Sequence, residues 1–399
     1  MRISTLQMYQ QGINSILNLQ AQVNKTQQQL ASGSRVNSAA DDPVAAVQIL
    51  DMTEDLSKLE GYTKNGEYAQ GDLARQETAI QDAVDLLQRA RELVVTANNG
   101  SQTTESRQAI AAELQQLNES LLAVANTRDA SGDYLFGGYQ SGEQPFSRNN
   151  GVVTYNGDEG GREIEVADGV NIRLRDSGRA LFMGVPTGNG TFDVKPDAGN
   201  SGTAVLGGSS ASTGFLRDEY TISFAVDGAG QTTYSVSDSG GAVVASGHYA
   251  AGENISFNGA KVQFSGSPAA GDSFTLERSA TTDMFGMMQG MVDALSSDDS
   301  SAAGAAQVHN AMASALGTLD QALGGLVGQQ TQLGARMNQA DTAISRNEAF
   351  SLQLQQNLSE VRDLDYAEAI SRLQMQLTTL EAAQKSYVSI SNLSLFDYL

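Results

Sequence analysis

The first thirty residues carry apolar side chains at alternating spacings of three and four. The members of this series are Leu6, Tyr9, Ile13, Ile16, Val23 and Leu30. Two gaps in the series hold Gln20 and Gln27. A mean spacing of 3.5 residues places these positions along one seam of a helix, as in a coiled coil. A helix with such a narrow apolar stripe is not stable alone, so the pattern predicts a helix over residues 1–31 that needs a partner helix.

The end of the chain repeats this pattern and supplies the best candidate partner. A seam begins at Leu354, Leu358 and Val361, and then restarts one residue out of phase. The second part of the seam consists of Tyr366, Ile370, Leu373, Leu377, Leu380 and Tyr387. We interpret the one-residue shift as a local change in helix winding.

Further helices are predicted between these two ends. Asp42 is a good N-cap and Pro43 a good first helical residue, so a long helix is expected from Pro43 to about Ala97. Ser101 or Thr103 is expected to cap a third helix. Residues 283–298 and 302–330 are rich in Ala, Leu and Met, which predicts that helices return there.

The middle of the chain has a different period. From Gly132 the sequence is rich in Gly, Ser, Thr and Asn, and Tyr220, Ile222 and Phe224 alternate with polar or small residues. Alternation with a period of two predicts strands. Asn258-Gly259 between two such runs predicts a hairpin turn. Residues 133–280 are therefore expected to be β-rich, with a possible division into two modules near residue 197.

These patterns predict an α+β fold. The economical arrangement brings both termini together as one discontinuous, elongated helical bundle or coiled coil and inserts the β-rich region between them. We expect a helical domain from residues 1–132 and 281–399 and a β-rich domain from residues 133–280.

Composition narrows the function classes. The chain has 399 residues and a formal net charge of −22, which argues against binding nucleic acid phosphates or anionic lipid. Cys is absent, so disulfides, thiolate metal sites and thiol nucleophiles are excluded. No apolar run is long enough to insert into a membrane. Residues 1–7 lack the apolar core of a secretory signal peptide, so none is expected.

Candidate catalytic chemistry is sparse. The two histidines, His248 and His309, are not brought together by the sequence, and no nucleophile elbow, phosphate loop or zinc-protease motif is present. Asp293, Asp298 and Asp299 lack the ligand spacing of a calcium loop, so a solvated helix end is the better interpretation. We therefore expect no catalytic residue, no cofactor-binding residue and no metal ligand.

Several segments, in the right order, resemble the bacterial flagellin family. They are residues 1–5, Gln29–Asn37, Asp41–Ala46, Ala125–Gly138 and the C-terminal Leu393–Leu399. Within that family the chain is most similar to the proteins that form the junction between the flagellar hook and the filament. The resemblance covers about residues 1–140 and 345–399. In the central region it is limited to short segments such as Tyr155–Asp158.

The resemblance implies a secreted structural subunit that leaves the cell through the flagellar type III export channel and forms a ring-like tier. Residues 1–31 and 366–399 would form the inner coiled-coil wall of the tube, with the β-rich domain facing outward. The implied partners are other copies of the chain, a hook-associated junction protein on the hook side and flagellin on the filament side. An export chaperone on the C-terminal helix is also implied. The expected assembly interface is Leu6, Tyr9, Ile13, Ile16, Val23, Leu30, Ile370, Leu373, Leu377, Leu380, Tyr387, Leu393, Leu395 and Phe396.

Two other functions stay open from the sequence. The chain could be a flagellin of the filament itself, which differs from a junction subunit in the number of copies per flagellum. It could also be a secreted adhesin or glycan-binding protein that uses the β-rich region. An enzyme is disfavoured because no nucleophile and base are paired.

Overall fold

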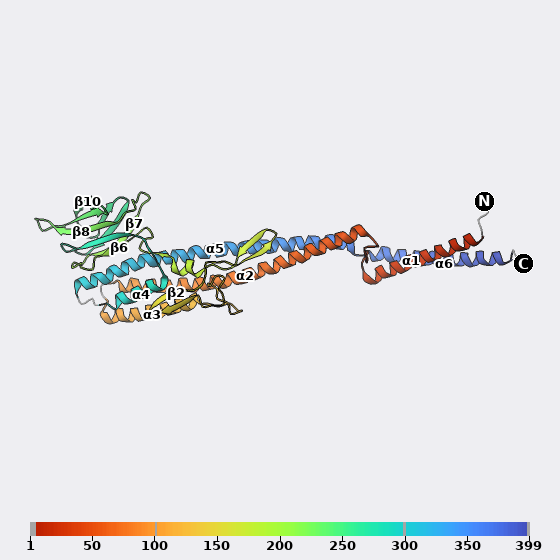
Figure 1. Ribbon diagram of the computed structural model, residues 1–399, viewed down its shortest axis with the longest axis horizontal. Coiled ribbons are helices and arrows are strands. Elements are labelled where there is room, and N and C mark those ends of the chain that lie inside the picture. The colour runs from red at the N-terminus through yellow and green to blue at the C-terminus, as the bar shows by residue number, and fades with distance from the viewer. Residues whose placement is uncertain (1–4, 100–101, 298–300, 397–399) are drawn as a thin grey trace. The chain divides into compact units, whose positions relative to one another are not determined.

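The computed structural model describes residues 5–99, 102–297 and 301–396, without the side chains of residues 5, 6, 8 and 390–396. The helices are α1 (Thr5–Ser32), α2 (Pro43–Ala97), α3 (Thr104–Ala125), α4 (Met284–Leu295), α5 (Ala302–Arg362) and α6 (Tyr366–Phe396). A short π-helical turn, η1, spans Arg179–Met183. Helices therefore occupy both ends of the chain and strands its middle, as the sequence predicted (Figure 1).

The chain divides into two compact units. The first comprises Met1–Asn65 and Thr342–Leu399, and the second comprises Gly66–Asp341. The first unit holds α1, α6, the first part of α2 and the last part of α5. The predicted boundaries at residues 132 and 281, which separate helices from strands, stay a prediction.

The predicted helix boundaries are accurate where capping residues mark them. α2 begins at Pro43, and the Asp42 carboxylate accepts a hydrogen bond from the Ala45 N–H at 3.1 Å. Thr103 caps α3 by accepting from the Ser106 N–H. Both contacts satisfy an N–H group that has no partner inside its own helix.

One predicted helical feature is wrong. The shift between the two C-terminal seams is a break between α5 and α6, because the helix ends at Arg362 and restarts at Tyr366. Asp365 caps the new helix, since its carboxylate accepts from the N–H groups of Ala367 and Glu368 at 2.9 and 3.1 Å. A change in winding alone would have left one continuous helix.

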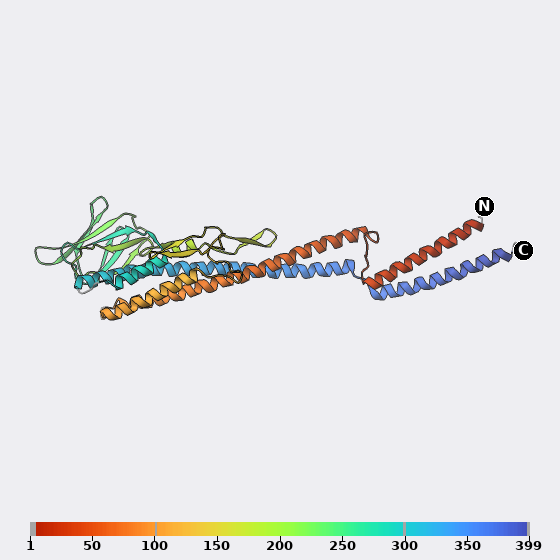
Figure 2. The ribbon, with the colours of Figure 1, turned by 60° about the horizontal axis from the view of Figure 1, so that its bottom comes forward.

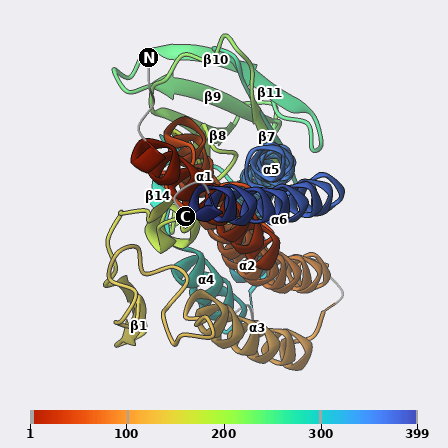
Figure 3. The same ribbon diagram turned by 90° about the vertical axis from the view of Figure 1, so that its right-hand side faces the viewer.

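The β-rich region lies in the second unit. Its strands are β1 (Phe146–Asn149), β2 (Val152–Tyr155), β3 (Glu163–Ala167), β4 (Val170–Arg173), β5 (Val185–Pro186), β6 (Phe192–Pro196), β7 (Val205–Ala211), β8 (Tyr220–Val226), β9 (Thr232–Asp238), β10 (Val243–His248), β11 (Asn254–Phe257), β12 (Ala260–Ser265), β13 (Ser273–Arg278) and β14 (Thr281–Thr282). The pairs β1–β2, β3–β4 and β5–β14 are small antiparallel ribbons. A larger sheet has the order β10-β9-β8-β13-β6, of which Figure 3 labels β10, β9 and β8, and a smaller sheet has the order β11-β12-β7.

The two larger sheets share one hydrophobic core. Alternate residues such as Ile222, Phe224 and Phe274 are buried between them. The Asn-Gly hairpin is confirmed, because Asn258 and Gly259 have positive φ angles of 42° and 82°. The turn near residue 197 joins β6 and β7, and Val194 and Leu206 on its two sides belong to the same core. The number of modules stays a prediction, and this shared core favours a boundary before β6.

The helical part of the second unit contains a buried ion cluster that the sequence did not reveal. The Arg175 guanidinium donates to both oxygens of Asp72, at 3.2 and 3.3 Å, and to Asp129 at 2.5 Å. Arg175 and Asp72 are almost completely buried. These contacts fasten the segment after β4 to α2 and to the loop after α3, so the strands are tied to the helices at this point.

Candidate assembly surface of the terminal helices

α1 and α6 lie side by side in antiparallel directions (Figures 1 and 2). Near the start of α1, the ring of Tyr9 meets that of Tyr387 edge to face, with centroids 5.9 Å apart. Further along, the Thr26 hydroxyl donates to the Gln376 side-chain oxygen at 2.9 Å. The partner that the sequence predicted for the N-terminal helix is therefore present within the same chain.

The face of α1 that meets α6 contains four of the predicted seam residues and differs from the prediction by one residue at the positions between them. It consists of buried or half-buried positions, namely Tyr9, Gly12, Ile16, Leu19, Val23, Thr26, Leu30 and Gly33 just beyond the helix. Four of the predicted positions, Tyr9, Ile16, Val23 and Leu30, belong to this face. Gly12, Leu19 and Thr26 take the places expected for Ile13, Gln20 and Gln27.

α6 shows the same displacement. Its buried or half-buried face consists of Ala369, Leu373, Gln376, Leu380, Ala383 and Tyr387. Leu373, Leu380 and Tyr387 were predicted, but Ala369 and Gln376 take the places expected for Ile370 and Leu377. Both helices keep the predicted mean spacing of 3.5 residues. The observed contact faces differ from the predicted ones only in that alternate contact positions lie one residue earlier.

Small side chains explain which stripe is used. A Cβ added at Gly12 would lie 3.0 Å from the Tyr387 ring, and one at Gly33 would lie 2.9 Å from the Tyr366 hydroxyl. Glycine at these positions lets a tyrosine of α6 approach the backbone of the opposite segment. Dispersion attraction depends on such close approach, so the stripes with small residues pack together.

The remaining apolar stripe of the helix pair faces outward. Ile13 is 43% exposed and Leu377 41% exposed, and Leu17, Ile370, Met375 and Val388 are exposed as well. α1 carries Lys25 as its one charged residue. A large exposed apolar surface with almost no charge is typical of a surface that contacts another protein.

Some predicted interface positions lie outside the described side chains. They are Leu6 near the N-terminus and Leu393, Leu395 and Phe396 at the C-terminus. Their place in the interface stays a prediction.

A short joint connects the paired helices to α2 and α5. Ser34 and Asp363 form an antiparallel bridge, in which the Leu364 N–H donates to the Gly33 carbonyl at 2.9 Å. The Arg35 N–H donates to the Arg362 carbonyl at 2.7 Å. These contacts fasten the two segments that leave the helix pair to each other.

Arg35 also satisfies the end of α5. Its guanidinium donates through Nε and Nη2 to the Val361 carbonyl, at 3.2 and 2.8 Å. The last carbonyls of a helix have no partner inside the helix, and they carry partial negative charge that a cation stabilises. This contact explains why α5 can end at Arg362 without a glycine.

Asp41 anchors the joint to α1. Its carboxylate lies 2.9 Å from the Lys25 ammonium and accepts from the Ser38 hydroxyl at 3.1 Å. The hydrogen bond from Lys25, followed by the one from Ser38, lowers the pKa of Asp41 from 3.8 to about 2. The carboxylate therefore stays ionised through the ordinary pH range and holds the loop against the helix.

Exposed apolar residues continue onto the other helices of the first unit. Val44, at 69% exposure, Val47 and Leu50 line the beginning of α2, and Phe350 and Leu352 lie on α5. Helical spacing places these α2 residues on a common face, and this face is exposed. These positions were missed because the sequence does not distinguish a core stripe from a contact stripe.

Metal-holding clusters and membrane-spanning helices are not apparent in the described residues. Those residues contain no group of three His, Cys, Asp or Glu side chains placed to hold a metal ion. Within the same residues, no helix combines the length and the apolar character that crossing a bilayer requires.

Comparison with known families places this architecture. Residues 3–141 match the bacterial flagellin N-terminal helical region, and residues 316–399 match the bacterial flagellin C-terminal helical region. Paired terminal helices with strands between them are thus the architecture of a flagellin-type protein.

The full-length similarities are more specific. Flagellar hook-associated protein 3 of Escherichia coli is 24% identical over 403 residues, 99% of each chain. The crystal structure of flagellar hook-associated protein-3 from Legionella pneumophila is 32% identical, with a TM-score of 0.74, and the match covers 78% of this chain and 99% of that one. The crystal structure of FlgL from Xanthomonas campestris is 34% identical, with a TM-score of 0.71, and covers 77% and 99%. The chain belongs to the flagellar hook-associated protein 3 family.

Proposed function

We propose that this chain is a structural subunit of the bacterial flagellum that forms the tier between hook and filament. Two similarities support this proposal. Hook-associated protein 3 of Escherichia coli matches 99% of this chain, and a Legionella pneumophila structure described as the flagellar junction protein matches 78% of it. A flagellin filament subunit and a glycan-binding adhesin are not favoured by these relatives.

The observation that carries the proposal is the second apolar stripe of the terminal helix pair. α1 and α6 pack against each other through one stripe of residues. They leave Ile13, Ile370 and Leu377 exposed on a second stripe. In the proposed mechanism the helix pair of a neighbouring copy covers this stripe. Because Ile13 and Leu377 are 43% and 41% exposed in the single chain, burial of the rest of each side chain stabilises the ring by about 1 kcal/mol.

The low charge of α1 favours close packing of several copies along this helix. A buried charge without a partner destabilises an interface by several kcal/mol. Lys25, the one charge on α1, is paired with Asp41 inside the chain. Copies can therefore approach along α1 without leaving a charge unpaired.

The remaining partners follow from position in the flagellum. In this proposal the tier contacts a hook-associated junction protein on the hook side and flagellin on the filament side. The subunit is exported without a cleavable signal peptide, and an export chaperone covers the exposed stripe of α6 before assembly. The chaperone would shield residues such as Ile370 and Val388, which are exposed in the chain by itself.

Electron microscopy of a strain that lacks the gene tests the proposal. We expect hooks without filaments and flagellin in the medium, and a plasmid copy of the gene should restore filaments. Quantitative mass spectrometry of purified flagella should find far fewer copies of this chain than of flagellin. Filaments attached normally in the deletion strain, or a copy number like that of flagellin, would contradict the proposal.

A further inference from the structure

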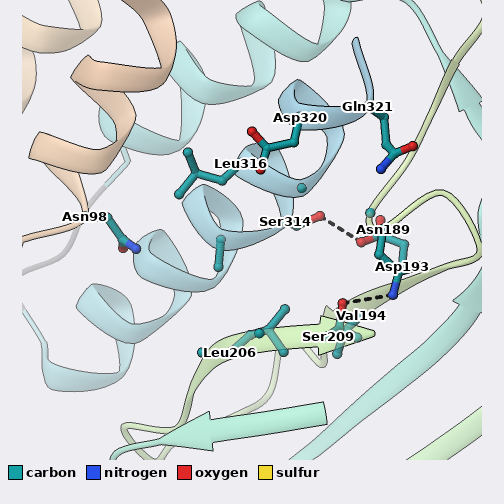
Figure 4. Close-up of a pocket in the computed structure, with 15 residues that line it drawn as sticks. Asn98, Asn189, Asp193, Val194, Leu206, Ser209, Ser314, Leu316, Asp320 and Gln321 are labelled. Carbon is teal, nitrogen blue, oxygen red and sulfur yellow. Dashed lines mark hydrogen bonds between the residues drawn. The ribbon is translucent and has the colours of Figure 1, made fainter. Parts of the chain in front are cut away.

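A polar pocket of about 340 Å³ lies in the second unit between α5 and the strands β6 and β7. Its walls include Asp193 on β6, Ser209 on β7 and Asp320 and Gln321 on α5 (Figure 4). Pockets that bind small molecules begin at about 300 Å³. The volume therefore fits a small molecule or the end of one side chain.

Glycines shape this pocket. A Cβ added at Gly317 of α5 would lie 2.9 Å from the carbonyl oxygen of Gly188, so a glycine is needed for α5 to approach that loop. A Cβ at Gly208 would meet no atom within 4 Å. Gly208 is an exposed residue of the pocket lining, so a larger side chain there would occupy open space.

One carboxylate in the pocket lacks a cation. Asp193 is only 6% exposed and accepts a hydrogen bond from the Ser314 hydroxyl at 2.9 Å (Figure 4). Across the described ranges, no Lys, Arg or His nitrogen lies within 4.0 Å of its oxygens. A buried carboxylate is costly unless a cation or several donors compensate it.

The neighbouring charges supply that compensation only in part, because Lys195, whose pKa is raised mainly by its hydrogen bond to Glu277, also interacts electrostatically with Asp193. Asp193 lies opposite Glu277 in the β6–β13 ladder, and the Lys195 ammonium is held by Glu277 at 2.5 Å. Asp320 is already paired with Arg91 at 2.7 Å. This face of the sheet holds the carboxylates of Asp193 and Glu277 and the ammonium of Lys195. One negative charge is therefore in excess, and Asp193 is the more deeply buried of the two carboxylates.

The remaining lining restricts the ligand. No Lys or Arg lines the pocket, which disfavours an anion, and no aromatic side chain lines it, which disfavours a stacked planar ring. A calcium ion takes six to eight oxygen ligands, and only Asp193 offers an unpaired carboxylate here. Asp193, Gln321 and Ser209 present oxygen acceptors, so the complementary ligand is a cation with several donors.

We propose that this pocket binds a guanidinium group, with Asp193 as its counter-ion. A guanidinium carries five N–H donors in a planar fork that matches a carboxylate and nearby oxygens. The group can come from a free small molecule or from an arginine side chain of another protein. The proposal is independent of the assembly surface on α1 and α6.

Titration of the full-length chain with N-acetyl-arginine amide tests this proposal, with binding followed by calorimetry. N-acetyl-citrulline amide, which has nearly the same shape without the charge, is the matched control ligand. We expect the arginine amide to bind at least tenfold more tightly than the citrulline amide. Equal binding of the two amides, or no saturable binding of either, would overturn the proposal.

Two variants locate the binding. Asp193→Asn should weaken binding at least tenfold, and Gly208→Val, which fills open space, should do the same without touching the charge. Glu253→Gln removes an exposed carboxylate from the same β-rich region and should leave binding unchanged. Thermal melts check that each variant is folded. Wild-type affinity in both pocket variants would overturn the assignment of the site.

A second ligand distinguishes the two sources. Agmatine carries a guanidinium on a short free chain, whereas the blocked arginine amide imitates an arginine within a protein. Tighter binding of agmatine supports a small-molecule ligand, and tighter binding of the arginine amide supports a partner's side chain. Failure of both ligands to bind would contradict the guanidinium assignment itself.

Discussion

Gly12 of α1 lies against the ring of Tyr387 of α6, so closely that an added Cβ would come within 3.0 Å of a ring carbon. This contact fixes which stripe of α1 meets α6. It brings Tyr9 beside the same tyrosine ring and turns Ile13 outward. The proposed assembly surface therefore depends on a residue without a side chain.

Gly12→Leu is expected to loosen the helix pair. The larger side chain must displace Tyr387, although it also removes a glycine that costs a helix about 1 kcal/mol. Hydrogen exchange of the α1 amides should become faster by at least tenfold. Gly61→Leu is the control, because Gly61 has nothing within 4 Å of its added Cβ. Unchanged exchange in Gly12→Leu would contradict the close contact.

The sequence was sufficient for elements that local interactions determine. α2 begins at Pro43 and ends at Ala97 as predicted, and Asp42 caps its first turn. The strand Tyr220–Val226 and the Asn258-Gly259 turn were also predicted, since alternation and turn chemistry are local signals. Periodicity identified both terminal helices and their pairing.

The sequence alone was insufficient where the structure depends on contacts between segments that are far apart in the chain. The heptad spacing fits two adjacent stripes equally, and only the fit of Gly12 against Tyr387 selects one. The break after Arg362 depends on Arg35, which is far away in the chain. The buried contact of Arg175 with Asp72 likewise joins residues 103 positions apart.

Arg175→Ala should be among the most destabilising single changes in the second unit. It leaves the buried Asp72 carboxylate with the partly exposed Arg75 as its remaining cation, and breaking a buried pair costs about 3–5 kcal/mol. Urea unfolding measures this loss. Arg89→Ala removes an arginine of which about half is exposed, and should cost about 1 kcal/mol or less. If Arg175→Ala lowers the free energy of unfolding no more than Arg89→Ala does, the cluster is not needed for stability.

The joint at Asp41 should weaken in acid. Its folded-state pKa, about 2, lies below the ordinary value of 3.8 because of Lys25 and Ser38. A lowered pKa contributes stability above pH 4 that is lost as the pH falls through about 2. A carbon-detected NMR titration of the Asp41 carboxyl measures this pKa.

Lys25→Met provides the matched variant for that titration. Removal of the ammonium takes away the strongest interaction with the ionised carboxylate, so the pKa of Asp41 should rise toward 3.8. The loop should then loosen at a higher pH than in the wild-type chain. An unchanged pKa in this variant would show that Lys25 does not hold the carboxylate.

The central claim is that the outward apolar stripe of the helix pair is the surface on which copies assemble. Leu377→Asp places a charge on that stripe, and Ala369→Asp places one inside the pair, where Ala369 is fully buried. We expect Ala369→Asp to speed hydrogen exchange of α1, and Leu377→Asp to change the stability of the pair by less than about 0.5 kcal/mol.

Incorporation of Leu377→Asp into flagella of the deletion strain is the most direct measurement. The account predicts that this variant is exported into the medium, keeps wild-type hydrogen exchange in α1 and is absent from purified flagella, so filaments are missing. Normal incorporation with attached filaments would contradict the account. So would exchange in α1 as fast as that of Ala369→Asp, because Leu377 would then belong to the core of the single chain.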